Sequence, residues 1–206
     1  MTVRLKKNNP ELLQQRRDLE RYNRYLPTLL LKRRLIQTEI LRVRRERAEL
    51  NARIERRIEE CGAALGVLAE SLPGPLTRFV LIADVRTGER NFAGVSLPVI
   101  EEVQFEVRPY SLRHTPSWVE AGVELLKELL AAREALRVTV AQELMLELEL
   151  RKVTQRVNLF EKVKIPEARE NIRVIRIALA EEQITAIGCA KIAKAKKSPT
   201  VAGAVL

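Results

Sequence analysis

Apolar residues recur at helical spacing in the first third of the chain. The steps between them alternate between three and four residues, with one extra step of four near Ile54. This seam contains Ile36, Ile40, Val43, Arg47, Leu50, Ile54, Ile58, Cys61, Leu65, Leu68 and Leu72. Such spacing predicts a long helix that packs against another helix along one side. Pro27 lies inside the same pattern, and we expect a kink there because apolar spacing resumes at Leu30.

A second stripe of apolar residues begins near Ser117 and continues to about Lys197. It contains Val119, Val123, Leu126, Leu130, Leu136, Val140, Leu144 and Leu148, followed by Val157, Phe160, Ile172, Ile175 and Leu179. Ser117 followed by Glu120 is typical of a capping box at the start of a helix. Pro166 lies between the two parts of the stripe, so we expect a bend there.

The centre of the chain has a different pattern. Most glycine and proline residues lie between Gly62 and Gly122, and they break helices. Short β-branched and aromatic runs predict strands at Arg78–Val85, Asn91–Val95 and Val103–Val107. The stretch Arg86–Glu89 favours a turn.

These patterns predict a mainly α fold, a long antiparallel two-helix coiled coil with a small central knob that contains a β-hairpin. We expect an N-terminal coiled-coil arm over 1–70, the knob over 71–117, and a C-terminal arm with a basic tail over 118–206. A parallel pair would require the knob to run back along an arm of about 90 Å, which leaves no slack for a hairpin.

The composition narrows the classes of function. Charged residues make up 31% of the chain, aromatic residues only 4%, and the net charge is +10. Two cysteines and one histidine exclude a disulfide framework and a Cys/His zinc cluster. No apolar run approaches the length of a membrane span, and the first residues do not resemble a secretory signal, so we expect a cytoplasmic protein.

No catalytic constellation is visible, and we expect no cofactor and no metal. The chain has neither of the glycine-rich loops that bind phosphate. His114 has no evident partner, and the adjacent Glu101 and Glu102 should point to opposite faces of an extended chain. Cys61 falls on the apolar seam, whereas Cys189 would react only if it were exposed among the C-terminal lysines.

Basic residues gather at the two ends of the chain. Antiparallel arms would bring both groups to one tip, made of Arg4, Lys6, Lys7, Arg16, Arg17, Lys191, Lys194, Lys196 and Lys197. This tip is a candidate for contact with phosphates or with other proteins. Neither end carries an aromatic residue for base stacking, and no DNA-binding motif is present.

One segment of the second arm is similar to a known signature. The stretch from Thr154 to Pro166 closely resembles the signature of the D subunit of V-type and A-type rotary ATPases. The matching residues are Thr154, Arg156, Val157, Asn158, Glu161, Ile165 and Pro166. The segments Leu29–Leu35, Gly94–Pro98 and Thr115–Trp118 resemble further parts of that family in the same order. Gln155 departs from the pattern, since an arginine is usual there.

The resemblance implies a non-catalytic central-stalk rotor subunit. Its tip would stand inside the ring of catalytic A and non-catalytic B subunits, and its knob end would meet the F subunit and the C subunit. The complex would couple ATP hydrolysis or synthesis to ion translocation through the membrane rotor, with this chain cytoplasmic and peripheral to the membrane. Without the resemblance, a basic coiled-coil nucleic-acid-binding protein or a coiled-coil adaptor would fit the composition equally well.

Overall fold

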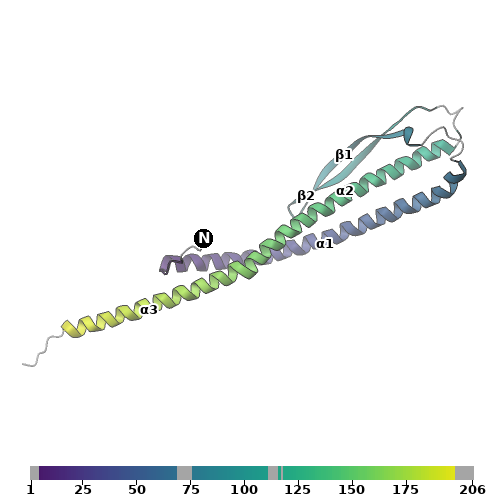
Figure 1. The fold of residues 1–206 in the computed structure, drawn as a ribbon. Helices are drawn as coiled ribbons and strands as arrows, with labels where there is room; N and C mark the ends of the chain where they lie inside the picture. The colour runs from purple at the N-terminus through teal and green to yellow at the C-terminus, as the bar shows by residue number, and fades with distance from the viewer. Residues whose placement is uncertain (1–4, 69–75, 111–115, 117, 198–206) are drawn as a thin grey trace, which may run out of the picture. The chain divides into compact units, whose positions relative to one another are not determined.

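The computed structural model describes residues 5–68, 76–110, 116 and 118–197, apart from the side chains of residues 63–68, 76 and 197. The elements are helix α1 (Asn9–Leu68), a 3-10 turn (Leu76–Arg78), strands β1 (Val80–Phe92) and β2 (Val95–Val107), helix α2 (Trp118–Leu159), a π-helical turn (Phe160–Lys164) and helix α3 (Ile165–Lys197) (Figure 1). The expectation of a mainly helical fold with a hairpin between two helical arms is confirmed. Within the described ranges, none of the helices has a stretch apolar enough to cross a membrane.

Helix α1 begins with a side-chain cap and continues through a proline. The side-chain oxygen of Asn8 accepts a hydrogen bond of 3.0 Å from the backbone N–H of Glu11, which satisfies a donor that the first turn leaves free. The helix continues past Pro27, as the apolar spacing predicts. Just beyond this proline, the hydroxyl of Thr28 donates a hydrogen bond of 2.7 Å to the carbonyl of Tyr25.

The chain divides into two compact units that cut across the segments expected from the sequence. The terminal unit contains residues 1–31 and 154–206, and the hairpin unit contains residues 32–153. In the terminal unit, Leu12 packs with Ile172 and Ile175. Further along the same pair, the rings of Tyr22 and Phe160 stack with their centroids 5.3 Å apart. As residue numbers increase along α1, the numbers of the residues that they contact on the other helical segment decrease. The two segments are therefore antiparallel.

In the hairpin unit, α1 and α2 also run antiparallel, as two ion pairs between them show. Lys32 pairs with Glu149 at 2.8 Å, and Arg57 pairs with Glu128 at 2.9 Å. Apolar residues of both helices are fully buried between these pairs, as is typical of a helix seam: Ile36, Val43 and Leu146; Val153 is fully buried just beyond Glu149. The first part of the seam predicted on α1 is thus confirmed, although Ile58, further along it, is 54% exposed.

The stripe predicted on α2 is wrong from Val140 to Leu148, although its later member Val157 is fully buried as predicted. Leu144 and Leu148 are 57% and 56% exposed, and Val140 is also exposed. The buried side of α2 instead carries Val138, Thr139, Gln142, Glu143 and Leu146. Polar side chains lie on this side because α1 and the hairpin supply hydrogen-bond partners for them, so apolar periodicity alone selected the wrong face.

The hairpin is longer than the sequence suggests. Arg86–Glu89 was expected to form a turn, but these residues lie within β1, and the chain reverses at Ala93 and Gly94. Both have positive φ, 50° and 80°, the pattern of a two-residue turn that suits twisted strands. The base of the hairpin packs on α2 through Val80, Val119 and Val123, all of them buried.

Helix geometry changes just before Pro166. The π-helical turn Phe160–Lys164 joins α2 to α3, so Pro166 falls in the first turn of α3, where a missing N–H costs least. The structure thus places a local irregularity where the sequence predicts a bend. Ser117 and His114 lie outside the described residues, and so does the capping box predicted at Ser117.

Candidate interaction surfaces

Acidic residues on the inner side of α2 are paired with arginines of α1. The side chain of Glu143 is only 9% exposed, and its two carboxylate oxygens accept hydrogen bonds of 2.7 Å from Arg44 and 2.6 Å from Arg47. Arg44 also donates a hydrogen bond of 2.7 Å to Glu147. The hydrogen bonds to Glu143 and Glu147 raise the pKa of Arg44 above its ordinary value, so this group stays charged. These contacts leave the carboxylate of Glu143 satisfied at the seam.

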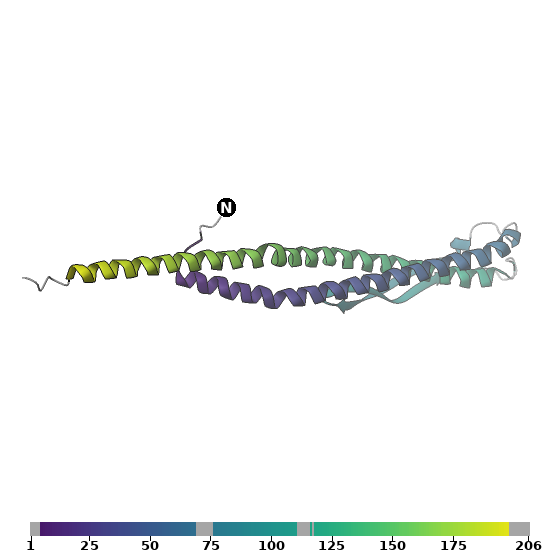
Figure 2. The ribbon, with the colours of Figure 1, turned by 90° about the horizontal axis from the view of Figure 1, so that it is seen from below.

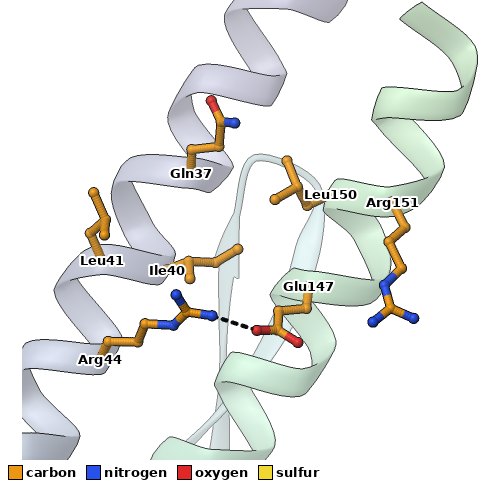
Figure 3. A pocket seen from close by; sticks show the side chains of 7 residues that line it. All are labelled: Gln37, Ile40, Leu41, Arg44, Glu147, Leu150 and Arg151. Atoms are coloured by element: carbon orange, nitrogen blue, oxygen red, sulfur yellow. Dashed lines mark hydrogen bonds and ion pairs between the residues drawn. The ribbon is translucent and has the colours of Figure 1, made fainter. Parts of the chain in front are cut away.

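An open groove lies between α1 and α2 in the hairpin unit. It has a volume of about 580 Å³, and it is lined by Gln37, Ile40, Leu41, Arg44, Glu147, Leu150 and Arg151. Figure 3 shows the Arg44–Glu147 ion pair closing one end of it, with the hairpin behind the two helices. The groove combines aliphatic and charged residues and is open to solvent. It can receive a side chain of another protein, but it holds no set of groups suited to acid–base or nucleophilic chemistry.

The last part of α3 has no partner helix in the described part of the terminal unit. Leu5 and Leu179 both pack on the cluster around Leu12, which marks the far end of the pairing. Beyond it, Ile184, Ile187 and Ile192 are 70%, 57% and 59% exposed. Figure 2 shows α3 continuing past the start of α1. This free end therefore offers unpaired isoleucines to another molecule.

The structure separates the two basic groups of the predicted tip. Lys6, Lys7, Arg16 and Arg17 are exposed at the start of the chain and on the first part of α1. Lys191, Lys194 and Lys196 are exposed on the free end of α3. Lys191 lies twelve residues beyond Leu179, about 18 Å at helical rise, so the two groups are staggered along the unit. Arg4 and the side chain of Lys197 lie outside the described residues.

The signature residues divide into an inner and an outer set. Val157 and Ile165 are buried, at 0% and 6% exposure, and they contribute to packing within the terminal unit. Thr154 is half-buried. The other members are exposed on the outer side of the helix: Arg156, Asn158, Glu161 and Pro166. The inner set accounts for structure, and the outer set is available for contacts.

The structure also describes the cysteines and the acidic residues that the sequence offered as candidates for catalysis or metal binding. Among the described residues, no group of three or more His, Cys, Asp or Glu side chains could hold a metal ion. Cys61 is partly buried and Cys189 is exposed, and both are free thiols. Glu102 pairs with Arg86 at 3.3 Å within the hairpin.

Sequence reasoning missed the buried polar residues Glu39, Gln142 and Glu143. For Glu143, a signal that could have revealed it is Arg47, which pairs with it. It occupies a seam position on α1, and an arginine at a seam requires an acidic partner on the facing helix.

In the described residues, two antiparallel helix pairs carry a packed hairpin, an open groove and a last part of α3 with exposed isoleucines. The sequence model of the family described as the D subunit of ATP synthase matches residues 11–195. The D subunit of the V-type ATP synthase of Borreliella burgdorferi is 33% identical over 192 residues, which cover 93% of each chain. That of Chlamydia abortus is 36% identical over 199 residues, which cover 94% of this chain and 93% of the relative. The chain belongs to the family of ATP synthase D subunits.

Proposed function

We propose that this chain is the non-catalytic central-stalk rotor subunit of a V-type or A-type ATPase or ATP synthase. It couples ATP hydrolysis or synthesis in the A/B ring to ion translocation through the membrane rotor. The observation that carries the proposal is the family match, which covers residues 11–195. The nucleic-acid and adaptor alternatives have no comparable support.

The surfaces suggest how such a rotor meets its partners. The free end of α3, with its exposed isoleucines and lysines, is the part that contacts the catalytic A and non-catalytic B subunits. The knob region, residues 71–117, is the part that faces the F subunit and the C subunit. The groove beside Arg44 and the exposed Leu144 add apolar area for such contacts on the hairpin unit. In this arrangement the chain is cytoplasmic and peripheral to the membrane.

The mechanism follows from asymmetry. The free end of α3 presents isoleucines and lysines unevenly around its axis, so each ring subunit meets a different surface at a given angle. Turning the shaft changes the conformation of a catalytic site only if the shaft binds the alternative conformations of that ring subunit with different affinities. Turning the shaft then moves each catalytic site in sequence between states that bind, convert and release nucleotide.

The proposal is tested by locking the free end of α3 to the ring. Cys61 and Cys189 are first changed to alanine, and a cysteine is introduced at Lys191 together with one in the facing ring subunit. Oxidation of the assembled complex should stop steady-state ATP hydrolysis, because no site can release product while the shaft is fixed. Reduction should restore it. A cysteine at Arg16 gives a second locking position on α1.

The matched control is the oxidised complex that carries the shaft cysteine without its ring partner, which should hydrolyse ATP at the unmodified rate. A complex with complete cross-linking, checked by gel mobility, that still hydrolyses ATP at its reduced rate would contradict the rotor role. The chain would then be a fixed tether within the assembly.

A further inference from the structure

The tip of the β-hairpin contacts both helices of the hairpin unit at one level. On one side, the guanidinium of Arg90 in β1 donates a hydrogen bond of 2.6 Å to Glu39 of α1. On the other side, the side-chain amide of Gln142 in α2 donates a hydrogen bond of 2.6 Å to the backbone carbonyl of Pro98 in β2. Arg90 faces Leu97 across the hairpin, and Pro98 is the next residue along β2, so both contacts come from one short section of the sheet.

The acceptor carboxylate of Glu39 and the side chain of Gln142 are shielded from solvent. Glu39 is 7% exposed and Gln142 is 8% exposed, while Leu97 beneath them is completely buried. The carboxylate of Glu39 also accepts hydrogen bonds of 2.8 Å and 3.1 Å from Arg42. The Arg42 bonds lie within α1 and hold the carboxylate in place, and the bond from Arg90 joins β1 to α1; its loss would leave a buried carboxylate with fewer charged donors.

The base and the tip of the hairpin are held by different forces. The base is attached to α2 by apolar packing around Val80, Val119 and Val123. The tip combines hydrogen bonds with the burial of Leu97. The ion pairs of Arg44 and Arg47 with Glu143 join α1 to α2 directly at one level, whereas the apolar packing on either side of them is not directional and leaves the helices able to roll on each other. A third element hydrogen-bonded to both helices restricts that motion.

We infer that Glu39, Arg90 and Gln142 are positioning residues that make the hairpin tip a brace between α1 and α2, which resists rotation of one helix against the other. The inference rests on the proposed rotor function for its biological consequence, since a shaft that transmits torque must not twist within itself. The brace itself is a property of the isolated chain and is tested there first.

The test compares Arg90→Gln and Gln142→Leu with Arg86→Gln. Arg86 lies on the same strand, and its ion pairs are to Asp84 and Glu102 of the hairpin itself, so its loss changes the charge equally without touching a helix contact. Hydrogen exchange of the backbone amides of residues 88–99 should be about tenfold faster in the two brace variants than in Arg86→Gln. Arg90→Lys should restore slow exchange, because an ammonium can also donate to Glu39.

A second measurement follows the helices directly. Spin labels at the exposed positions Leu35 of α1 and Leu144 of α2 report the spread of interhelical distances. The distribution should broaden in Arg90→Gln and Gln142→Leu and remain narrow in Arg86→Gln. Equal exchange and equal distance distributions in all three variants would overturn the brace, whatever the role of the chain.

The assembled complex then tests the consequence. With the brace removed, ion transport per ATP hydrolysed should fall while nucleotide binding to the ring is unchanged. If the interhelical distance distribution broadens but ion transport per ATP hydrolysed stays normal, the brace exists but has no role in torque transmission. A complex that fails the cross-linking test above would reject the rotor role itself, so the two failures are distinguishable.

Discussion

Two leucines of α2, close in sequence, have opposite environments and give a direct test of the helix pairing. Leu146 is 0% exposed and Leu144 is 57% exposed. The apolar stripe predicted from the sequence places Leu144 on the inner side of the helix, whereas the structure places Leu146 there. Changing each to alanine therefore separates the two assignments with the same chemical deletion.

The expected magnitudes follow from burial. Leucine to alanine removes three carbon atoms, worth roughly 2.4 kcal/mol of transfer free energy at a fully buried site, and the cavity left behind adds to this. Leu146→Ala should therefore lower the free energy of unfolding by about 3 kcal/mol. Leu144→Ala should change it by less than about 0.5–1 kcal/mol, as is usual for a largely exposed side chain.

The assay is urea denaturation of the isolated chain, followed by the helical circular dichroism signal. The slope of the transition should be the same in both variants, so that a change of midpoint reports stability alone. A larger loss in Leu144→Ala than in Leu146→Ala would refute the face of α2 that the structure assigns, and with it the pairing of Glu143 with Arg44.

Two further substitutions test the turn of the hairpin and the carboxylate of Glu39 on α1. Gly94→Ala should cost roughly 1–2 kcal/mol because φ is +80°, and faster amide exchange at the hairpin turn checks this. Ala93→Gly is the control, which should be neutral or stabilising because it relieves a positive φ. Hydrogen bonds from Arg42, with the charges of Arg42 and Arg90, lower the pKa of Glu39 below its ordinary 4.5. Its ionised form therefore stabilises the fold above that ordinary value, and this contribution is lost as the pH falls through the lowered pKa. The stability difference between the unchanged chain and Glu39→Gln should thus shrink from about pH 6 to about pH 3, and urea denaturation at each pH measures it. A difference that does not change with pH would contradict the ionised assignment.

The first part of the seam on α1 could be predicted because Ile36, Ile40 and Val43 follow one another at helical spacing and are all buried, although Leu35 and Leu41 beside them are exposed. On α2, apolar residues occur on two faces, so the sequence alone permits two assignments. Leu144 and Leu148 continue the spacing as well as Leu146 and Val153 do. The choice between them depends on Arg44 and on other distant polar partners, which a local pattern does not contain.

The turn of the hairpin was missed for a related reason. Gly88 in the stretch Arg86–Glu89 looks like a turn glycine, but it lies inside β1 under the side chain of Glu101, where an added Cβ would clash with the carboxylate. The true turn uses Ala93, a residue without preference for positive φ. The positions of the free helix end and the groove also depend on where the pairing stops, and that depends on contacts between distant residues.

The charge pairs at Glu143 also determine which misaligned assemblies the chain avoids. A slip of α2 by one heptad in either direction would bring Leu136 or Leu150 to the place of Glu143. Arg44 and Arg47 would then face a leucine, and the carboxylate would move away from its two guanidinium partners. A seam of leucines alone would accept such a slip, or a second copy of the chain in place of the proper helix, at little cost. A single shielded glutamate thus restricts the chain to one alignment with itself during folding, before any partner protein is present.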